Sequence, residues 1–408
     1  MPASSARLSA RDPAIAAILL TVIQIGLAFI VARGYPRDAD EHFAIRGFVR
    51  TNAYELLCAA DCLWYAAIAH EGYHSSIPPV RIQEGESNVA FFPAFPIMVR
   101  ATYHAVSASS RSISWPSAAL LASQIATVGF WFVLLSLMRA WELSPGAAVL
   151  IVFAIVSHPS SFFMIAGHSE SLYLLGIVGM LWCGEFAPAW GAFPGAIVGA
   201  TRLLGFSFIV YPAMRSLRAR GSRRLGWFLS AAGICLGGIA FLVYCQTRFG
   251  MWDLYFQTQH LGWGHLSDYW FFLRPGSYRL ALPFRKTVVT ALVVLSAAAV
   301  LEWRVGAKDP DRERTWTRRA LLLAAFAQFY LAGAGGARTD RVSTPFVGFG
   351  RYTLPIGLLV ALVFAGQWRL LHLPGRAARI AVWAILCTCL GSLIFMNVLR
   401  EAVTHFRR

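Results

Sequence analysis

The stretch AIAAILLTVIQIGLAFIV, from Ala14 to Val31, runs for eighteen residues without a charged side chain. A helix of that length crosses the hydrocarbon core of a bilayer. The stretch is too long, and too poorly followed by a small-residue cleavage site, to favour a removable signal peptide. It therefore predicts a membrane-spanning helix near the N-terminus.

The rest of the chain repeats this pattern. Of its 408 residues 57% are hydrophobic and 14% are charged, whereas about a quarter are charged in a typical soluble protein. The mean hydropathy is +0.56. Strand alternation and the even turn spacing of a membrane barrel are absent from the sequence. We expect an all-α polytopic membrane protein, with residues 1–408 forming one membrane-embedded domain. Its predicted spans, eleven in number, are 14–32, 93–109, 117–138, 146–164, 171–186, 191–213, 227–246, 286–302, 319–335, 351–366 and 379–398.

The net charge of +16 comes largely from arginines in three connections, at 214–226, 303–318 and 367–378. Basic clusters beside apolar spans are what the positive-inside bias produces. We therefore expect a lipid bilayer, and no nucleic acid, as the partner of these arginines. Only two lysines occur, a skew typical of a GC-rich bacterial genome, so a multi-pass protein of the bacterial inner membrane is expected.

Strict alternation from a cytoplasmic N-terminus puts all three basic connections inside and the loop 33–92 outside, facing the periplasm. Two features of the sequence do not fit this topology. The segment 158–170 falls on the inside, and the basic tail that ends at Arg408 falls on the outside.

The loop 33–92 is too long for a simple connection and holds eight of the chain's twenty acidic residues. Both Ala44–Ala59 and Asp61–His70 can be written as amphipathic helices that lie at the membrane interface. Within the loop, Cys58 and Cys62 flank Asp61, and a disulfide between them is awkward if both lie on one helix. A long loop rich in acids is where chemistry is commonly placed.

On a helix, Asp61 lies on one stripe with Trp64, Tyr65 and Ile68, at spacings of three, four and seven residues. An acid in the first turn is favoured in its ionised form by the helix dipole. The aromatic side chains would form a floor for a sugar ring. The alternative is an ordinary N-terminal acid on an interfacial helix whose aromatic residues face lipid.

Further polar residues occur at membrane depth. The segment from His158 to Tyr173 contains His168 and Glu170, and such residues among apolar neighbours point to function. Arg202 lies inside a predicted span, where a phosphate would compensate its charge. Arg351 and Tyr352 open the tenth span.

Taken in order, these motifs resemble the PIG-V family of membrane mannosyltransferases, which are of the GT-C type. They are Asp-x-x-Trp-Tyr-x-x-Ile-Ala-x-x-Gly-Tyr from Asp61, Ala-Phe-Phe-Pro-x-x-Pro from Ala90, His-Pro-Ser-Ser-Phe-Phe with Ser-Glu-Ser-Leu, Arg-x-x-Gly from Arg202, and Arg-Tyr at Arg351. The resemblance spans most of the chain. One departure is that Ala60 precedes Asp61, where the family has tryptophan.

The resemblance implies a GT-C-like bundle and a polyprenyl-phosphate-linked sugar donor, with a glycan or glycolipid hydroxyl as acceptor. Asp61 matches the essential acid, and His168 and Glu170 match a donor-binding motif. A phosphate leaving group requires no general acid, so one carboxylate suffices as base, while Arg202 and Arg351 compensate the phosphate charge. Transfer with inversion is expected. Mannose rests on the resemblance alone, and the acceptor and any divalent metal stay open.

Two other functions compete with this interpretation. His70-Glu71-Gly-Tyr-His74 matches the zinc metalloprotease signature H-E-x-x-H, although Gly72 weakens the helix that the signature requires. A lipid or sugar transporter or flippase would also use buried charges, but no internal symmetry between halves is visible. Loss of transfer in Asp61→Asn, with activity kept in Glu71→Gln, would separate the transferase from the protease.

Overall fold

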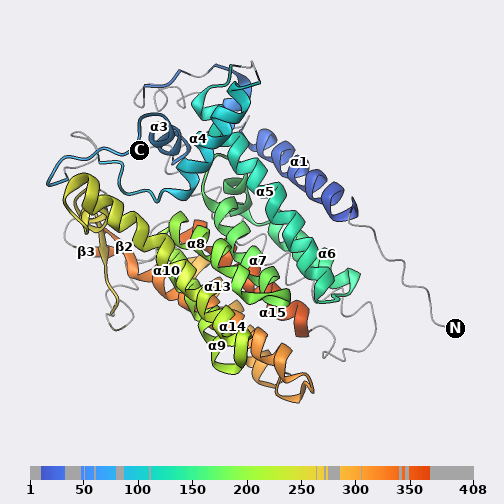
Figure 1. Cartoon of the computed structure of the whole chain (residues 1–408). Helices are drawn as coiled ribbons and strands as arrows, with labels where there is room; N and C mark the ends of the chain where they lie inside the picture. Colours follow the sequence, from blue (N-terminus) through green and yellow to red (C-terminus); the bar gives the residue numbers. More distant parts are fainter. Residues whose placement is uncertain are drawn as a thin grey trace.

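The computed structural model describes residues 11–32, 47–49, 51–58, 61–79, 87–109, 112–262, 264–270, 273, 285–304, 306–339, 342–344 and 349–367. Within these residues the chain is a bundle of helices (Figure 1). The last predicted span, 379–398, the third basic connection and the C-terminal tail lie outside the described residues.

Helices form wherever the described part of the chain has a predicted span. The α-helices are α1 (Arg11–Ala32), α3 (Asp61–Glu71), α4 (Ala94–Ser107), α5 (Trp115–Ala140), α6 (Pro145–Val156), α7 (Glu170–Phe186), α8 (Ala192–Thr201), α9 (Val210–Arg218), α10 (Gly221–Phe249), α11 (Leu254–Gln257), α13 (Arg285–Arg304), α14 (Arg312–Ala334) and α15 (Phe349–Gln367). Short 3-10 or π turns are η1 (Ala53–Leu57), η3 (Pro159–Met164), η4 (Pro188–Gly191), η5 (Leu203–Ile209), η6 (Thr258–Gly262) and η9 (Gly306–Lys308).

A small antiparallel sheet was not expected from the sequence. Its strands are β1 (His265–Ser267), β2 (Gly335–Thr339) and β3 (Val342–Thr344), in the order β1-β2-β3. The strands are three to five residues long, too short for the alternation of apolar and polar residues to be recognised. The fold is thus helical, with this sheet as a local addition.

Three of the described helices are long and apolar enough to cross a membrane, namely α1 over Asp12–Phe29, α5 and α10. Two further apolar helices, α6 and α15, are shorter. Membrane association is supported by these helices, whereas a bundle of about eleven crossings stays a prediction.

The second predicted span, 93–109, forms a helix that is short for a membrane crossing. Helix α4 has 14 residues, so it is about 21 Å long, well short of a hydrocarbon core of about 30 Å. It packs along α3. Trp115, which opens α5, stacks on Tyr103 with ring centroids 3.7 Å apart and lies 5.0 Å from the ring of His70. The chain therefore enters α5 at the end where α3 lies.

The sixth predicted span, 191–213, is not one crossing, because the chain reverses at Arg202. Along α8 a Cβ on Gly199 would lie 1.9 Å from the carbonyl oxygen of Ile234 in α10. After Arg202 the chain runs back along α10, so that Tyr211 meets Trp227 at 5.6 Å. The backbone of Arg202 is extended, and the helix breaks there.

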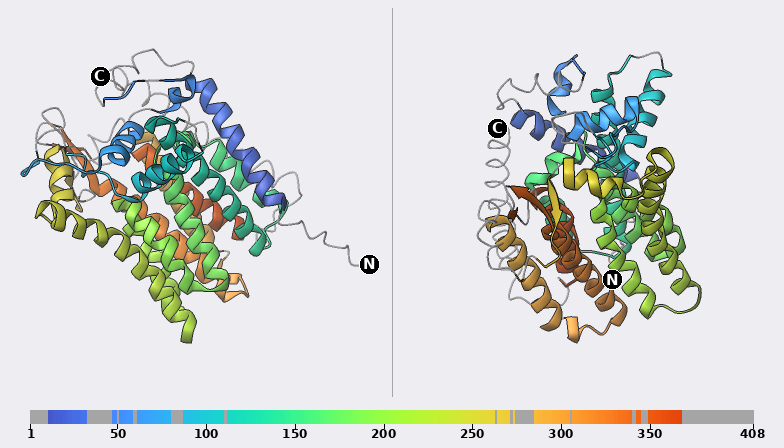
Figure 2. Two further views of the ribbon diagram at one scale, coloured as in Figure 1. Left: turned by 45° about the horizontal axis from the view of Figure 1, so that its top comes forward. Right: turned by 90° about the vertical axis from the view of Figure 1, so that its left-hand side faces the viewer.

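These two features bear on the predicted topology. The segment 158–170 lies at the same end as α3, and not on the opposite side as strict alternation predicts, because Gly167 packs against Cys62 and Glu170 shares Arg351 with Asp61. Because the chain runs back along α10 after α8, the basic connection 214–226 still lies at the other end, together with the connection between α13 and α14 (Figures 1 and 2).

Helix α3 is buried, in contrast to the interfacial helix expected for Asp61–His70. Trp64, Tyr65 and Ile68 expose 7% or less of their surface, since α4 and α5 cover the helix. Of the other predicted amphipathic helix, Ala44–Ala59, the described part contains only the single turn η1.

Candidate active site

The acid singled out by the sequence, Asp61, is the first residue of α3 and pairs with Arg351 in the first turn of α15. Its Oδ2 accepts a hydrogen bond of 2.6 Å from Nη1 of Arg351. The two side chains are 19% and 27% exposed. Asp61 is therefore held in place but still accessible from one side.

Glu170, the first residue of α7, is the buried counterpart of Asp61, with 2% of its side chain exposed. Its Oε1 accepts hydrogen bonds from Nε and Nη2 of Arg351, at 3.0 and 2.8 Å. Nη2 of Arg202 lies 3.0 Å from the same oxygen. Two guanidinium groups on one carboxylate favour its ionised form. We call Asp61, Glu170, Arg202 and Arg351 the acid–arginine cluster; its formal charges cancel.

Each member of the cluster lies at or near the end of a helix. Asp61 and Glu170 occupy helix N-termini, where the helix dipole favours an acid. Arg202 occupies the extended link between α8 and η5, which turns its side chain toward the start of α7. The cluster thus joins four segments that are far apart in the sequence.

Ser169, which had no predicted role, connects the cluster to α3. Its Oγ accepts from the hydroxyl of Tyr65 at 2.9 Å and from Nη2 of Arg202 at 2.7 Å. Burial raises the pKa of Tyr65, a rise that the charge of Arg202 only partly offsets, so its phenol stays protonated and donates. Tyr65 therefore positions Ser169 and presents little surface to a ligand.

Aromatic rings surround the two arginines. The guanidinium of Arg351 lies 4.9 Å from the ring centre of Phe163, and that of Arg202 lies 5.9 Å from Tyr352. Such cation–π contacts fix the orientation of a guanidinium group. Trp64, by contrast, stacks on Phe91 at 5.6 Å and is 7% exposed. Tyr352 therefore contacts an arginine of the cluster, whereas Trp64 packs on Phe91.

His168 lies in the turn before α7, and its protonation follows from its partners. Nδ1 is 2.9 Å from the carbonyl oxygen of Ala166, which only accepts, so Nδ1 carries the proton. Burial lowers the pKa of His168, and the charge of Arg351 lowers it further, so the ring is neutral. The buried Nε2 therefore offers a lone pair, which suits a ligand hydroxyl better than a phosphate oxygen.

Four buried polar atoms at this site have no hydrogen-bond partner among the described residues. They are Nε2 of His168, Oε2 of Glu170, Oγ of Ser171 and Nη1 of Arg202. A buried polar group left unsatisfied costs about 1–3 kcal/mol. A polar ligand or ordered water bound here would satisfy them.

Glu55 anchors the segment before Asp61. In the sequence it stands out only as one of the eight acidic residues of the loop 33–92. Its carboxylate accepts from Thr51, Ser114 and Ser117, and so ties η1 to the N-terminus of α5. Burial alone would raise the pKa of Glu55, but these hydrogen bonds outweigh it and lower that pKa below its ordinary value. Ser114 and Ser117 lie some sixty residues from Glu55 in the sequence, so no local pattern predicts this role.

A disulfide joins Cys58 to Cys62 beside Asp61. The geometry expected to be awkward on one helix is avoided because Cys58 precedes α3. Gly167 makes room for it, since a Cβ there would lie 2.3 Å from Sγ of Cys62, and its φ of +76° favours glycine. The disulfide thus joins the segment before α3 to the first turn of α3, and the turn that carries His168 packs against Cys62.

The zinc-protease signature does not lie on one helix. Helix α3 ends at Glu71, and Gly72 follows with a φ of +88°. Nδ1 of His74 lies 3.0 Å from the side-chain nitrogen Nδ2 of Asn88, whereas His70 contacts Glu71 at the exposed surface. In the part of the chain that the structure describes, no group of three or more His, Cys, Asp or Glu residues is arranged to hold a metal ion.

Comparison with known proteins adds no relative: no family profile matches this chain, and no curated protein is significantly similar to it in sequence.

Proposed function

We propose that this chain is a membrane glycosyltransferase that moves a hexose, by resemblance mannose, from a polyprenyl-phosphate donor to an acceptor hydroxyl with inversion. The observation that carries the proposal is the acid–arginine cluster. Residues chosen from four separate motifs of the sequence, 290 residues apart at the extremes, meet within hydrogen-bond distance.

The two acids of the cluster suit different roles. Glu170 is buried and satisfied on Oε1 by both arginines, so it holds their guanidinium groups in place. Asp61 makes one bond to Arg351 and is partly exposed, so it can accept a proton from an incoming hydroxyl. A base must reach the proton that it removes, which favours Asp61 over Glu170.

The proposed reaction is one in-line displacement. Asp61 takes the proton of the acceptor hydroxyl, and the acceptor oxygen forms a bond to the anomeric carbon of the sugar. The bond from that carbon to the donor phosphate breaks, and its electron pair leaves with the phosphate. Arg351 and Arg202 stabilise the charge that develops there. No covalent intermediate forms, so the anomeric configuration inverts.

The proposed setting is a multi-pass arrangement in the bacterial inner membrane. The cluster lies at the end of the bundle opposite the connections 214–226 and 303–318 (Figure 1). If these arginine-rich connections follow the positive-inside rule, the cluster faces the periplasm. The donor's isoprenoid tail would then stay in the outer leaflet.

The test is transfer of radiolabelled mannose from polyprenyl-phosphate mannose to a membrane extract that supplies acceptors. The purified chain should support transfer, and Asp61→Asn should lower the rate by about 100-fold or more, the usual contribution of a general base. Glu71→Gln, at the exposed end of the same helix, is the matched control and should stay active. Transfer that survives Asp61→Asn, or a product that keeps the donor's configuration, would contradict the proposal.

A further inference from the structure

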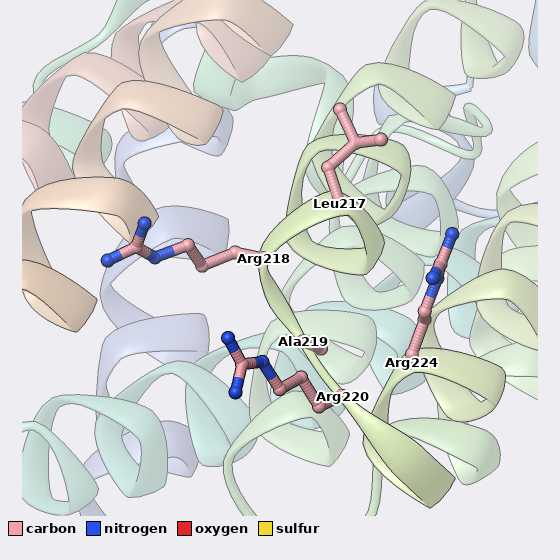
Figure 3. Close-up of a pocket in the computed structure, with 5 residues that line it drawn as sticks. All are labelled: Leu217, Arg218, Ala219, Arg220 and Arg224. Carbon is pink, nitrogen blue, oxygen red and sulfur yellow. The ribbon is translucent and has the colours of Figure 1, made fainter.

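At the end of the molecule away from Asp61, the turn between α9 and α10 encloses a basic hollow. It has a volume of about 500 Å³, and its lining is Leu217, Arg218, Ala219, Arg220 and Arg224 (Figure 3). In Figure 3 the side chains of Arg218 and Arg220 extend to the same side of the turn. A second hollow, of about 370 Å³, shares Arg218, and its charged lining also includes Asp309, Arg312 and Arg319.

The turn is held in place by a different arginine. Arg215 is buried, pairs with Glu313 of α14 at 2.7 Å, and lies 5.0 Å from the ring centre of Trp227. The contacts of Arg215 fix α9 against α14 and α10 without using the other arginines of the turn.

The arginines of the hollow are exposed and uncompensated. Among the described residues, no ion pair or hydrogen bond connects Arg218, Arg220 or Arg224 to an acid. Three guanidinium groups on one fixed turn form a basic surface whose charge a bound anion would compensate. Phosphate oxygens match the planar donors of a guanidinium group.

An exposed apolar stripe begins beside the hollow and follows α10 over most of its length. Its members recur at helical spacings of three, four and seven residues, and each is at least 41% exposed: Leu225, Phe228, Leu229, Leu236, Ile239 and Val243. Helix α10 is one of the three helices long and apolar enough to cross a membrane. Acyl chains would cover this stripe.

We propose that the hollow binds the headgroup phosphate of an anionic glycerophospholipid, whose acyl chains lie along the α10 stripe. The arginines of the hollow and the start of the apolar stripe are adjacent, as the phosphate headgroup and the acyl chains are in such a lipid. A zwitterionic headgroup would bring a cation next to three arginines and bind less well. The site is independent of the proposed transferase activity, because it lies at the other end of the bundle (Figure 1).

The test is native mass spectrometry of the full chain in non-ionic detergent, titrated with phosphatidylglycerol or phosphatidylcholine. Phosphatidylglycerol should bind more tightly and saturate at one site. Each arginine near anionic lipid contributes roughly fivefold in affinity, so replacing Arg218, Arg220 and Arg224 together by glutamine should weaken binding about 100-fold. The triple arginine-to-lysine variant, which keeps the charge, should retain most of the affinity.

A matched pair of single variants controls for net charge. Arg218→Gln should weaken phosphatidylglycerol binding about fivefold, whereas Arg248→Gln, in the last turn of α10 and outside the hollow, should leave it unchanged. Equal binding of the two lipids, or equal loss in the two variants, would overturn the proposal. So would full competition by inorganic phosphate at equal concentration, which would assign the hollow to a free phosphate.

Discussion

Replacing either acid of the cluster by its amide should separate their roles, because the structure holds them differently. Glu170→Gln removes a buried charge that compensates two arginines, and Arg202 is then left with no acid. Asp61→Asn removes a partly exposed charge, and Arg351 keeps both of its bonds to Glu170. We expect the first change to destabilise the fold and the second to abolish transfer.

The magnitudes follow from burial. Removing one partner of a buried ion pair costs about 3–5 kcal/mol, and we expect about 3 kcal/mol for Glu170→Gln, since the amide oxygen still accepts one hydrogen bond. The pair of Asp61 with Arg351 is 19% and 27% exposed, so solvent screens it, and Asp61→Asn should cost roughly 1 kcal/mol. The stability losses should therefore differ about threefold, in the opposite order to the losses of activity.

The assay is unfolding in mixed micelles by titration with a denaturing detergent, followed by tryptophan fluorescence, beside the transfer assay. The double variant of Glu170→Gln with Arg202→Gln removes both charges of the buried pair, so it should lose about 1–2 kcal/mol less than the sum of its parts. Equal destabilisation by Asp61→Asn and Glu170→Gln, or strict additivity in the double variant, would refute this division of roles.

Three further predictions concern the surroundings of Asp61. Gly167→Ala should destabilise the protein by about 2–3 kcal/mol, because the added Cβ would meet Sγ of Cys62. Gly72 also has a positive φ but has open space around it, so Gly72→Ala should cost about 1 kcal/mol. Thermal unfolding of the two variants measures the difference. Replacing Cys58 and Cys62 together by serine should lower the transfer rate without removing the donor's binding, as measured by titration with polyprenyl-phosphate mannose. The lowered pKa of Glu55 contributes stability above its unfolded pKa that is lost as pH falls through the folded pKa, so Glu55→Gln should flatten the acid limb of an unfolding-versus-pH curve.

Members of the cluster can be predicted from the sequence because they are charged residues where a membrane protein is expected to be apolar. Charged residues at membrane depth are costly, and Glu170 and Arg202 both occur among apolar neighbours. Their pairing compensates both charges, which explains why two residues that are costly at membrane depth occur in one chain. The helices are predictable for a similar reason, since apolar runs such as Ala14–Val31 have few other stable conformations in a membrane.

Local patterns could not predict where the chain reverses. Residues 191–213 are apolar enough for one crossing, and the break at Arg202 depends on Glu170, which lies more than thirty residues away. Likewise, α4 carries apolar residues that pack on α3. From the sequence alone, apolar residues that pack inside the molecule cannot be told apart from apolar residues that face lipid. The anchoring of Glu55 by Ser114 and Ser117 escapes prediction because it joins a loop to a distant helix start.

The pairing of Asp61 with Arg351 also sets the order of events in the proposed reaction. While Asp61 is ionised, it holds Nη1 of Arg351 at 2.6 Å and shares that cation with Glu170. When Asp61 accepts the acceptor's proton, it loses its charge at the moment when the departing phosphate gains a second one. The attraction of Arg351 then shifts from the base to the leaving group, without any change in the net charge of the site. A lysine at this position could pair with Asp61 but could not keep two bonds to Glu170 during the shift. Arg351→Lys should therefore slow transfer more than it weakens donor binding.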